Sequence, residues 1–471
     1  MTSRNVVLSA FPVELGDGYV MRADGLVFIE PGSEGSALWI ASPFEIVSVT
    51  RDEGYCGWGF VIRWRDDMGE CHAWACPRRM LMEKPEAVIE ALVDGGMRIN
   101  PGQKERFLLV LSRVSSGVVS LNMLGSGWRI TMDSVSFLLP GYQAYGKSDQ
   151  RASLVFQSVW PSDGSFYGHE GSLEDWKLRV AQPAMSDERL VFALCVGFAG
   201  PLLDIMNRSW MGVHFLGSCH DLNRTVLVLA ASVWGVGAVG RQVRRWDDFR
   251  LDEMRHLRAS LVPAMTCDTL LALSGLDESD PEAVGVLFGL LSGRDSDLAR
   301  SLEWSDFFPR DWRTVVFSSG LASEFARFGE CSFRDVERVS EIASSRFSVV
   351  PDWVSSDGGE SAELMAVLPE IVRNARMYCG MAGRSYVESL VRDFQVSPRE
   401  VYAAISEIEQ VFFNLVVREH DSLVLREVIR NFGLILAGGV LAVRFGILPC
   451  SEEEIREAVR RAYECWRCSV I

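Results

Sequence analysis

One short segment constrains the fold of this chain most, because it changes from strand-like to helix-like within a few residues. Residues 213–216 form an apolar run that predicts a β-strand, and residues 226–234 form a longer apolar stretch that predicts a buried helix. Residues 217–225 join them as a tight loop. A strand, a tight loop and a helix in this order predict an α/β fold. They are also the context in which a phosphate-binding loop occurs.

The loop keeps the first residue of the phosphate-binding pattern and loses the others. That pattern is Gly, four residues, then Gly-Lys-Ser/Thr. After Gly217, the last three positions hold Leu222, Asn223 and Arg224. The lysine of the pattern reaches the β- and γ-phosphates and its hydroxyl residue binds magnesium, which asparagine and arginine cannot do in these positions. We therefore predict a degenerate loop without a cofactor, and expect ATP and magnesium only if the loop functions.

The length and charge of the chain narrow the class of protein. Its 471 residues exceed one hydrophobic core and predict two or three domains. The net charge of −16 argues against a broad phosphate-coating surface, although Arg241, Arg244 and Arg245 could form a local basic stripe for nucleic acid. The 11 cysteines show no disulfide framework and the N-terminus shows no signal segment, so we expect a cytoplasmic protein.

Local patterns divide the chain into three expected parts. Residues 1–185 predict a β-rich N-terminal domain with a hairpin near residues 63–70. Residues 186–395 predict an α/β core with further strands at 270–273 and 314–317. Residues 396–471 predict a helical C-terminal domain, whose last helix begins at a capping box of Ser451 and Glu454.

Two apolar stretches, residues 190–206 and 432–448, raise the question of a membrane. Both are interrupted by glycines, and by Pro201 or Arg444, and both fall short of the roughly 20 clean residues of a spanning helix. We expect them to be buried helices and expect no membrane association.

A series of short blocks in chain order carries a resemblance to a known family. The blocks cover most of the chain and lie at residues 42–45, 50–53, 58–59, 63–66, 72–74, 98–102, 126–128, 171–176, 198–203, 230–235, 317–320 and 382–384. With them the chain resembles domain of unknown function 927, a helicase-like family described as superfamily II helicases and inactivated derivatives. The family includes helicases of cassette-type mobile elements. The resemblance implies a P-loop NTPase core of the AAA+ type in residues 186–395.

The resemblance also implies a second ATPase element, a buried strand that ends in Asp-Glu and serves magnesium and the attacking water. The corresponding strand here is residues 270–273, which Ser-Gly follows. Asp277 and Glu278 are the candidate acidic pair, but their place beyond the strand favours the solvated start of a helix. Ser318 is a candidate polar sensor. Arg338 is a candidate for acting in a neighbouring subunit's site, or is a surface arginine.

A slipped alignment of the loop leaves an alternative open. Asn223, Arg224 and Thr225 would then match Gly-Lys-Thr in a loop one residue longer, and Thr225 would be a magnesium ligand. Asparagine tolerates left-handed backbone, but the planar guanidinium of Arg224 is a poor substitute for a lysine in a tight cradle. Because both ATPase elements are altered, we predict that hydrolysis is lost.

These observations give one leading hypothesis and two alternatives. The leading one is a catalytically inactive derivative of a mobile-element ATP-dependent DNA helicase. It would act by assembly as a homo- or hetero-oligomer, or by association with DNA or a replication protein. The alternatives are an active ATPase with a non-standard phosphate loop, and a regulatory binding module with a remodelled pocket. We predict no metal site, because Cys56, Cys71, His72 and Cys76 lack the spacing of a zinc ribbon.

Overall fold

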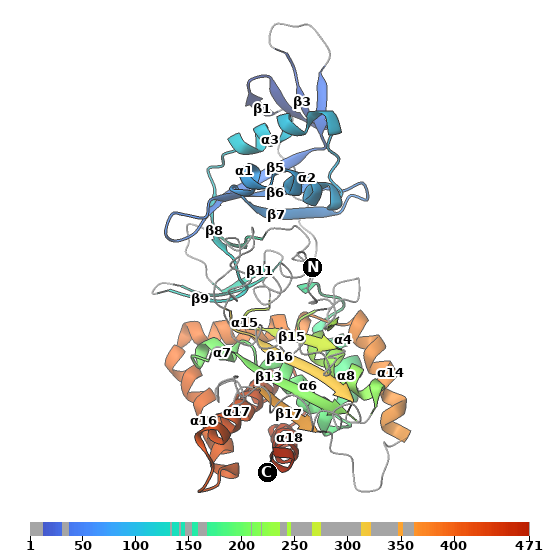
Figure 1. Ribbon diagram of the computed structural model, residues 1–471, viewed down its shortest axis with the longest axis vertical. Coiled ribbons are helices and arrows are strands. Elements are labelled where there is room, and N and C mark those ends of the chain that lie inside the picture. Colours follow the sequence, from blue (N-terminus) through green and yellow to red (C-terminus); the bar gives the residue numbers. More distant parts are fainter. Residues whose placement is uncertain are drawn as a thin grey trace, which may run out of the picture. The chain divides into compact units, whose positions relative to one another are not determined.

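The computed structural model divides into two compact units, drawn in Figure 1 with colours that follow the sequence. Unit 1 comprises residues 1–124, 141–144 and 148–164, and unit 2 comprises residues 125–140, 145–147 and 165–471. The structure describes residues 13–30, 37–131, 134–140, 143–146, 153–158, 167–208, 210–217, 219–235, 243–245, 266–274, 312–321, 347–351 and 362–470.

Unit 1 contains two β-sheets and short helices. An antiparallel sheet has the order β1-β2-β3-β4, and a mixed sheet has the order β12-β8-β5-β6-β7. The strands are β1 (Val13–Gly16), β2 (Tyr19–Arg22), β3 (Gly25–Phe28), β4 (Leu38–Ala41), β5 (Phe44–Arg51), β6 (Gly59–Arg65), β7 (Cys71–Pro77), β8 (Val119–Met123) and β12 (Ser153–Phe156). The helices are α1 (Met80–Glu83), α2 (Pro85–Asp94), the 3₁₀ turn η1 (Pro101–Gln103) and α3 (Lys104–Arg113). The antiparallel pairing of β6 with β7 confirms the predicted hairpin.

Unit 2 is organised around a parallel sheet of five strands in the order β14-β15-β16-β13-β17. These are β13 (Met211–Gly217), β14 (Val243–Arg245), β15 (Leu270–Ser274), β16 (Val315–Leu321) and β17 (Phe347–Pro351). Every residue of β13 is buried, as expected for a central parallel strand covered on both faces. A smaller sheet, mostly in unit 2, has the order β11-β10-β9 and consists of β9 (Gly127–Ile130), β10 (Val135–Leu139) and β11 (Gln143–Gly146).

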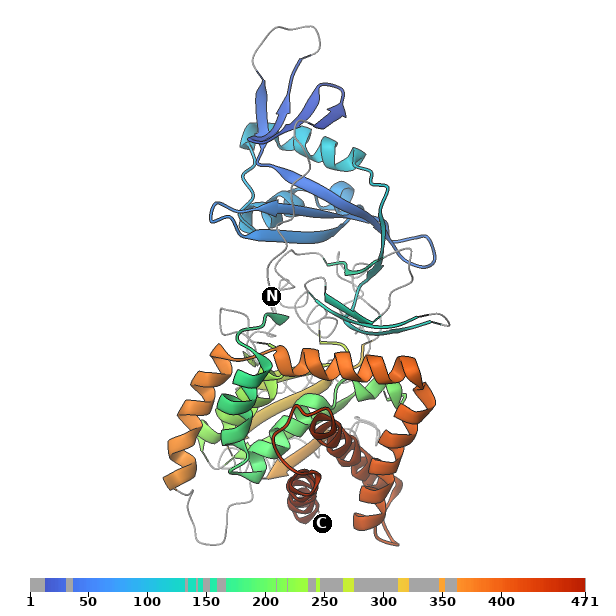
Figure 2. The same cartoon turned by 180° about the vertical axis from the view of Figure 1, so that it is seen from behind.

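Helices cover the parallel sheet and join it in one hydrophobic core. They are α4 (Leu173–Trp176), the π-helical η3 (Lys177–Ala181), α5 (Gln182–Ala184), α6 (Glu188–Phe198), α7 (Leu202–Ile205), α8 (His220–Ser232), α14 (Ala362–Met377), α15 (Met381–Val396), α16 (Pro398–Val416), α17 (Leu423–Arg444) and α18 (Glu452–Val470). Helix α8 packs on β13, β15 and β16, and α6 packs against α8, α17 and α18. Figure 2, the view from behind, shows the orange and red helices α14–α18 beside the parallel sheet.

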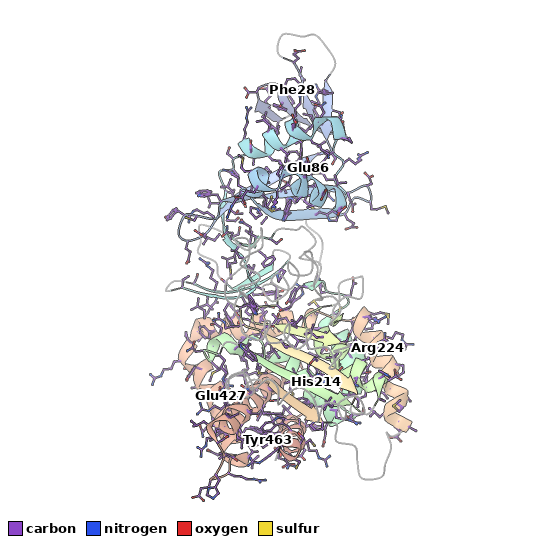
Figure 3. The ribbon with its side chains drawn as sticks, in the orientation of Figure 1. Phe28, Glu86, His214, Arg224, Glu427 and Tyr463 are labelled. Carbon is purple, nitrogen blue, oxygen red and sulfur yellow. The ribbon has the colours of Figure 1, made fainter. Side chains whose placement is uncertain are left out.

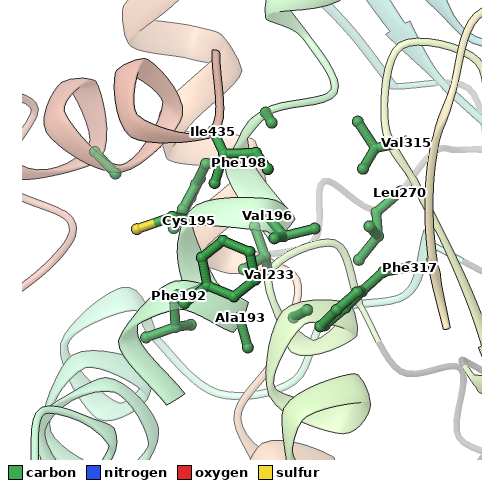
Figure 4. Close-up of a cluster of buried hydrophobic side chains, with 14 of the residues drawn as sticks. Phe192, Ala193, Cys195, Val196, Phe198, Val233, Leu270, Val315, Phe317 and Ile435 are labelled. Carbon is green, nitrogen blue, oxygen red and sulfur yellow. The ribbon is translucent and has the colours of Figure 1, made fainter. Parts of the chain in front are cut away.

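The close-up in Figure 4 shows how this core is assembled from distant parts of the sequence. Phe192 and Phe198 of α6 lie with Leu270 of β15, Phe317 of β16 and Ile435 of α17, and all five are buried. Large apolar side chains from helix and sheet therefore share one interior. Burying each of them contributes on the order of 1.5–3 kcal/mol relative to exposure.

The structure confirms most of the predicted elements of unit 2. Strands predicted at residues 213–216, 270–273 and 314–317 correspond to β13, β15 and β16. The predicted C-terminal helices correspond to α16, α17 and α18, and Ser451 and Glu454 make the reciprocal hydrogen bonds of a capping box. The apolar stretches considered for a membrane lie in α6, α7 and α17. Among the described residues, no helix has the length and apolar character needed to cross a bilayer.

The division into units differs from the predicted three parts. Residues after 396 fall in the same unit as the parallel sheet, and side chains such as Ile405 of α16 and Val459 of α18 belong to the same core as β13 and α8. The helical C-terminal part is therefore packed into unit 2.

Candidate functional site

The candidate site lies at the carboxyl-terminal end of the parallel sheet, where β13, β15 and β16 end. Since the strands are parallel, their carboxyl ends lie side by side. The loop that follows β13 leads directly to α8, with strand partners on both sides of β13. Crevices outside the carboxyl ends of parallel strands are where open α/β sheets bind ligands.

The connection between β13 and α8 is shorter than the sequence pattern predicted. Strand β13 ends at Gly217 and α8 begins at His220, so Leu222, Asn223, Arg224 and Thr225 lie in the first turns of the helix. The sequence had placed these residues in the loop and the helix from residue 226. The helix starts early because Cys219 caps it, its sulfur accepting a hydrogen bond from the Leu222 N–H at 3.5 Å. That N–H is one of the few at a helix start that could otherwise face an anion.

Asn223 connects α8 to the ends of two strands. Its side-chain oxygen accepts a hydrogen bond from the Gly217 N–H at 3.0 Å, and its side-chain nitrogen donates to the Gly320 carbonyl at 2.7 Å. The Ser319 hydroxyl donates to the Asn223 carbonyl at 3.1 Å. A Cβ at Gly217 would lie 2.1 Å from the Asn223 oxygen, so the close approach requires glycine there. We call this set of contacts the Asn223 clamp.

The side chains of the other three residues that the sequence placed in the loop lie in different environments. Leu222 is fully buried in the core. Thr225 is also fully buried, and its hydroxyl donates to the Asp221 carbonyl at 2.6 Å, a bond within the helix. Arg224, labelled in Figure 3, is exposed. Asn223, at the lysine position of the pattern, is therefore buried, and Arg224, at the hydroxyl position, is exposed.

Ser318 lies inside the sheet, one strand position before Ser319. The sequence placed it just after a strand that ended at residue 317, but β16 continues to Leu321. Ser318 stands opposite His214 in the register of β13 and β16, and its hydroxyl is 2.8 Å from the His214 Nδ1. Both side chains are buried (His214 is labelled in Figure 3). The neighbouring Ser319, which follows Ser318 at the position of the predicted sensor, donates its hydroxyl to α8 instead.

The remaining predicted site residues either lie outside the described part of the chain or belong to β14. Asp277, Glu278, Arg338 and Arg241 lie outside the described residues, so their roles remain predictions. Arg244 and Arg245 lie on the edge strand β14, where Arg245 is in register with Ser274 at the carboxyl end of β15. The described part of the chain holds no cluster of three or more side chains suited to a metal ion.

Comparison with known proteins places the chain in a family. Residues 19–294 match the family described as Domain of unknown function (DUF927). No curated protein matches the chain. A solved structure described as "SCCmec type IV Cch - active helicase" is similar with a TM-score of 0.63 over 96% of this chain and 78% of that chain. Its 13% sequence identity makes this a likeness of fold. The family match spans more than half of the sequence and confirms the resemblance seen in its short blocks, so the chain belongs to the DUF927 family.

Proposed function

We propose that this protein is a catalytically inactive derivative of a mobile-element DNA helicase with a degenerate P-loop core, and that it acts by association with other subunits or with nucleic acid. The likeness of fold to an active helicase supports the helicase ancestry. The Asn223 clamp is the observation that most supports the loss of hydrolysis, because it uses the strand end, the helix start and the lysine position for an internal contact.

The chemistry of phosphoryl transfer explains why this contact matters. The developing negative charge on the phosphate needs cations and aligned donors, and this electrostatic stabilisation is usually the largest contribution to catalysis. The position of the cradle lysine is Asn223, a neutral amide whose donor and acceptor are both occupied by backbone groups. A strand-to-helix connection that runs from Gly217 to His220 also provides fewer N–H groups than a loop of the full pattern.

The slipped alignment gains no support from these contacts. It requires Thr225 to bind magnesium, but this side chain is fully buried and bonded to the helix backbone. It also requires Arg224 to act as the phosphate-binding cation of a loop, but Arg224 lies in α8, which begins at His220. The active alternative would therefore need the first turns of α8 to unwind.

We expect the purified full-length protein to release no inorganic phosphate from ATP above the level of Arg224→Ala, with magnesium and with or without single-stranded DNA. Arg224 is exposed, so this substitution leaves the fold intact while removing the cation that the slipped alignment needs. Phosphate release is measured with an enzyme-coupled assay. Turnover by the unmodified protein that disappears in Arg224→Ala would establish the active alternative instead.

Association with DNA gives a second expected result. We propose that Arg244 and Arg245 on the edge strand contact phosphates. Replacing both by alanine should then reduce the slope of log affinity against log salt by roughly 1.4 on single strands, since each phosphate contact contributes about 0.7. Fluorescence anisotropy of a labelled oligonucleotide at several salt concentrations measures the slope.

The matched control for that experiment is Arg373→Ala with Arg392→Ala, which removes two exposed arginines of unit 2 from α14 and α15. If the control pair changes the slope as much as the β14 pair, the effect is one of net charge and the proposed contact is wrong. If the unmodified protein shows no salt-dependent binding, nucleic-acid association through these residues is excluded.

A further inference from the structure

A cluster of charged side chains, in which one carboxylate is buried and its partners are partly exposed, lies at the opposite end of the parallel sheet, where β15 and β16 begin. Asp268, two residues before β15, has only 1% of its surface exposed and a left-handed backbone with φ of 55°. One of its carboxylate oxygens accepts a hydrogen bond from the Trp128 N–H at 3.1 Å, and the other accepts from Arg313 Nε at 3.2 Å. Arg313 also forms an ion pair of 2.8 Å with Asp204 on α7. A non-glycine residue held in such a conformation in the interior is a strained feature that the surroundings must maintain.

The charges of this cluster do not balance when both carboxyl groups are ionised. Two carboxylates share one guanidinium, and arginine does not release its proton in proteins. Carboxylates that share a site in this way tend to retain a proton. Burial raises the pKa of Asp268 to about 7, against the lowering effect of Arg313 and with a further increase from Asp204. Burial also raises the pKa of Asp204, which Arg313 lowers.

The remaining titratable groups around Asp268 stay neutral near pH 7. Burial raises the pKa of the Cys267 thiol and of the Tyr167 phenol above their ordinary values. Strand β9 contributes a backbone N–H to Asp268. The proton balance of the cluster is therefore set by Asp204, Arg313 and Asp268.

The cluster contacts residues 126–128, which lie where the chain first enters unit 2. We call these residues the entry segment. A Cβ at Gly127 would lie 2.2 Å from an Asp268 carboxylate oxygen, so backbone and carboxylate are in direct contact. The Ser126 hydroxyl donates to the Cys267 carbonyl at 2.9 Å, and the Trp128 indole N–H donates to the Pro201 carbonyl at 2.7 Å. The entry segment is thus bonded to Cys267 through the Ser126 side chain and to Asp268 through the Trp128 backbone.

We propose that Asp204, Arg313 and Asp268 form a proton-dependent latch on the entry segment. With one proton shared between the two carboxyl groups the cluster is neutral and the segment is held closed. Loss of that proton to solvent leaves one uncompensated negative charge in the interior, and the segment loosens. Because a solvated carboxyl has its ordinary low pKa, the closed state binds the proton more tightly than the open state, and closure weakens as pH rises.

Hydrogen exchange of the full chain tests the latch. With the pKa of Asp268 near 7 in the closed state and 3.8 in the open state, the protection of amides in the entry segment should fall about tenfold from pH 6 to pH 8. This fall is measured after correction for the intrinsic pH dependence of amide exchange. Strands β6 and β7 of unit 1 serve as the internal reference and should keep their protection.

Two variants separate the latch from a merely structural ion pair. Asp204→Asn leaves one carboxylate with one guanidinium and removes the increase that Asp204 adds to the pKa of Asp268, so the entry segment should stay protected at pH 8 and its pH dependence should shrink. Asp187→Asn removes a carboxylate from a different buried arginine pair, with Arg189, and should keep the tenfold change. A corrected protection that is independent of pH in the unmodified protein, or a pH dependence that is undiminished in Asp204→Asn, overturns the proposal.

Discussion

Replacing Asn223 by leucine should lower the free energy of unfolding of unit 2 by about 2–6 kcal/mol, because a buried backbone N–H and a partly buried backbone carbonyl lose their partners. The Gly217 N–H and the Gly320 carbonyl are both bonded to the Asn223 side chain, which is 6% exposed. Leaving a buried donor or acceptor unsatisfied costs roughly 1–3 kcal/mol each. Leucine has the same branching and number of heavy atoms, but its methyl groups are larger than the amide oxygen and nitrogen, so overpacking against Gly217 adds to the loss of hydrogen bonds.

Hydrogen exchange in rising urea measures this loss locally, in peptides that cover β13 and α8. The matched control is Arg224→Leu, one residue further along the same helix and exposed, where a change within about 0.5 kcal/mol is expected. If Asn223→Leu were as mild as the control, the clamp would contribute nothing to the connection between α8 and the two strands. The contacts of Asn223 would then give no reason for the loss of hydrolysis.

Three strands of the parallel sheet, β13, β15 and β16, were predictable from sequence because their signal is local, whereas β14 and β17 were not predicted. Central parallel strands are continuous apolar runs, and residues 213–216, 270–273 and 314–317 show this without any knowledge of their partners. The capping box of Ser451 and Glu454 was predictable for the same reason, since both partners lie within one turn.

The clamp was not predictable, because its partners are distant in sequence. Asn223 binds the carbonyl of Gly320, a backbone group that carries no residue-specific signal. The early start of α8 was also hidden, since His220, Asp221 and Arg224 are polar and exposed and Cys219 is an unusual cap. The pattern therefore predicted the position of the site, whereas the conformation of its residues depends on tertiary contacts.

The domain boundary predicted at residue 396 is absent from the two units of the structure for a related reason. The composition of the last helices is that of a helical domain, but composition does not show which surface an amphipathic helix covers. Helix α18 packs against α6, and the polar side of the same helix carries the ion pair of Arg461 with Glu188. A helical region that buries its apolar side chains against the sheet's own helices joins their core.

Replacing Arg467 by methionine should destabilise the attachment of α18 by about 3–5 kcal/mol, since it leaves a buried carboxylate without its partner. The Arg467 guanidinium binds Asp421 through two contacts of 2.5 and 3.1 Å, and it donates to the Tyr463 hydroxyl at 2.6 Å. The side chains of Arg467 and Asp421 are 7% and 3% exposed. Methionine keeps the apolar stem but removes every one of these bonds.

The pH dependence of this effect has a definite sign. Burial alone raises the pKa of Asp421, but hydrogen bonds from Arg467 and from the Arg418 N–H outweigh it, so the pKa lies below its ordinary value. The pair therefore stabilises the folded state above the unfolded pKa of 3.8, and this contribution is lost as pH falls through the lowered folded value. The penalty of Arg467→Met should be full at pH 7 and should shrink in acid.

Two further variants show whether the buried pair carries the effect. Arg456→Met, on the same helix, breaks an ion pair with Glu452 at 2.8 Å whose side chains are 39% and 30% exposed, and it should cost no more than about 1 kcal/mol. Asp421→Asn combined with Arg467→Met should recover part of the loss, because no uncompensated charge remains in the interior. Hydrogen exchange of peptides from α18 in rising urea measures all three. Equal losses at Arg456 and Arg467 would mean that α18 is held by its apolar side chains alone, and that the Asp421–Arg467 pair fixes its position without stabilising it.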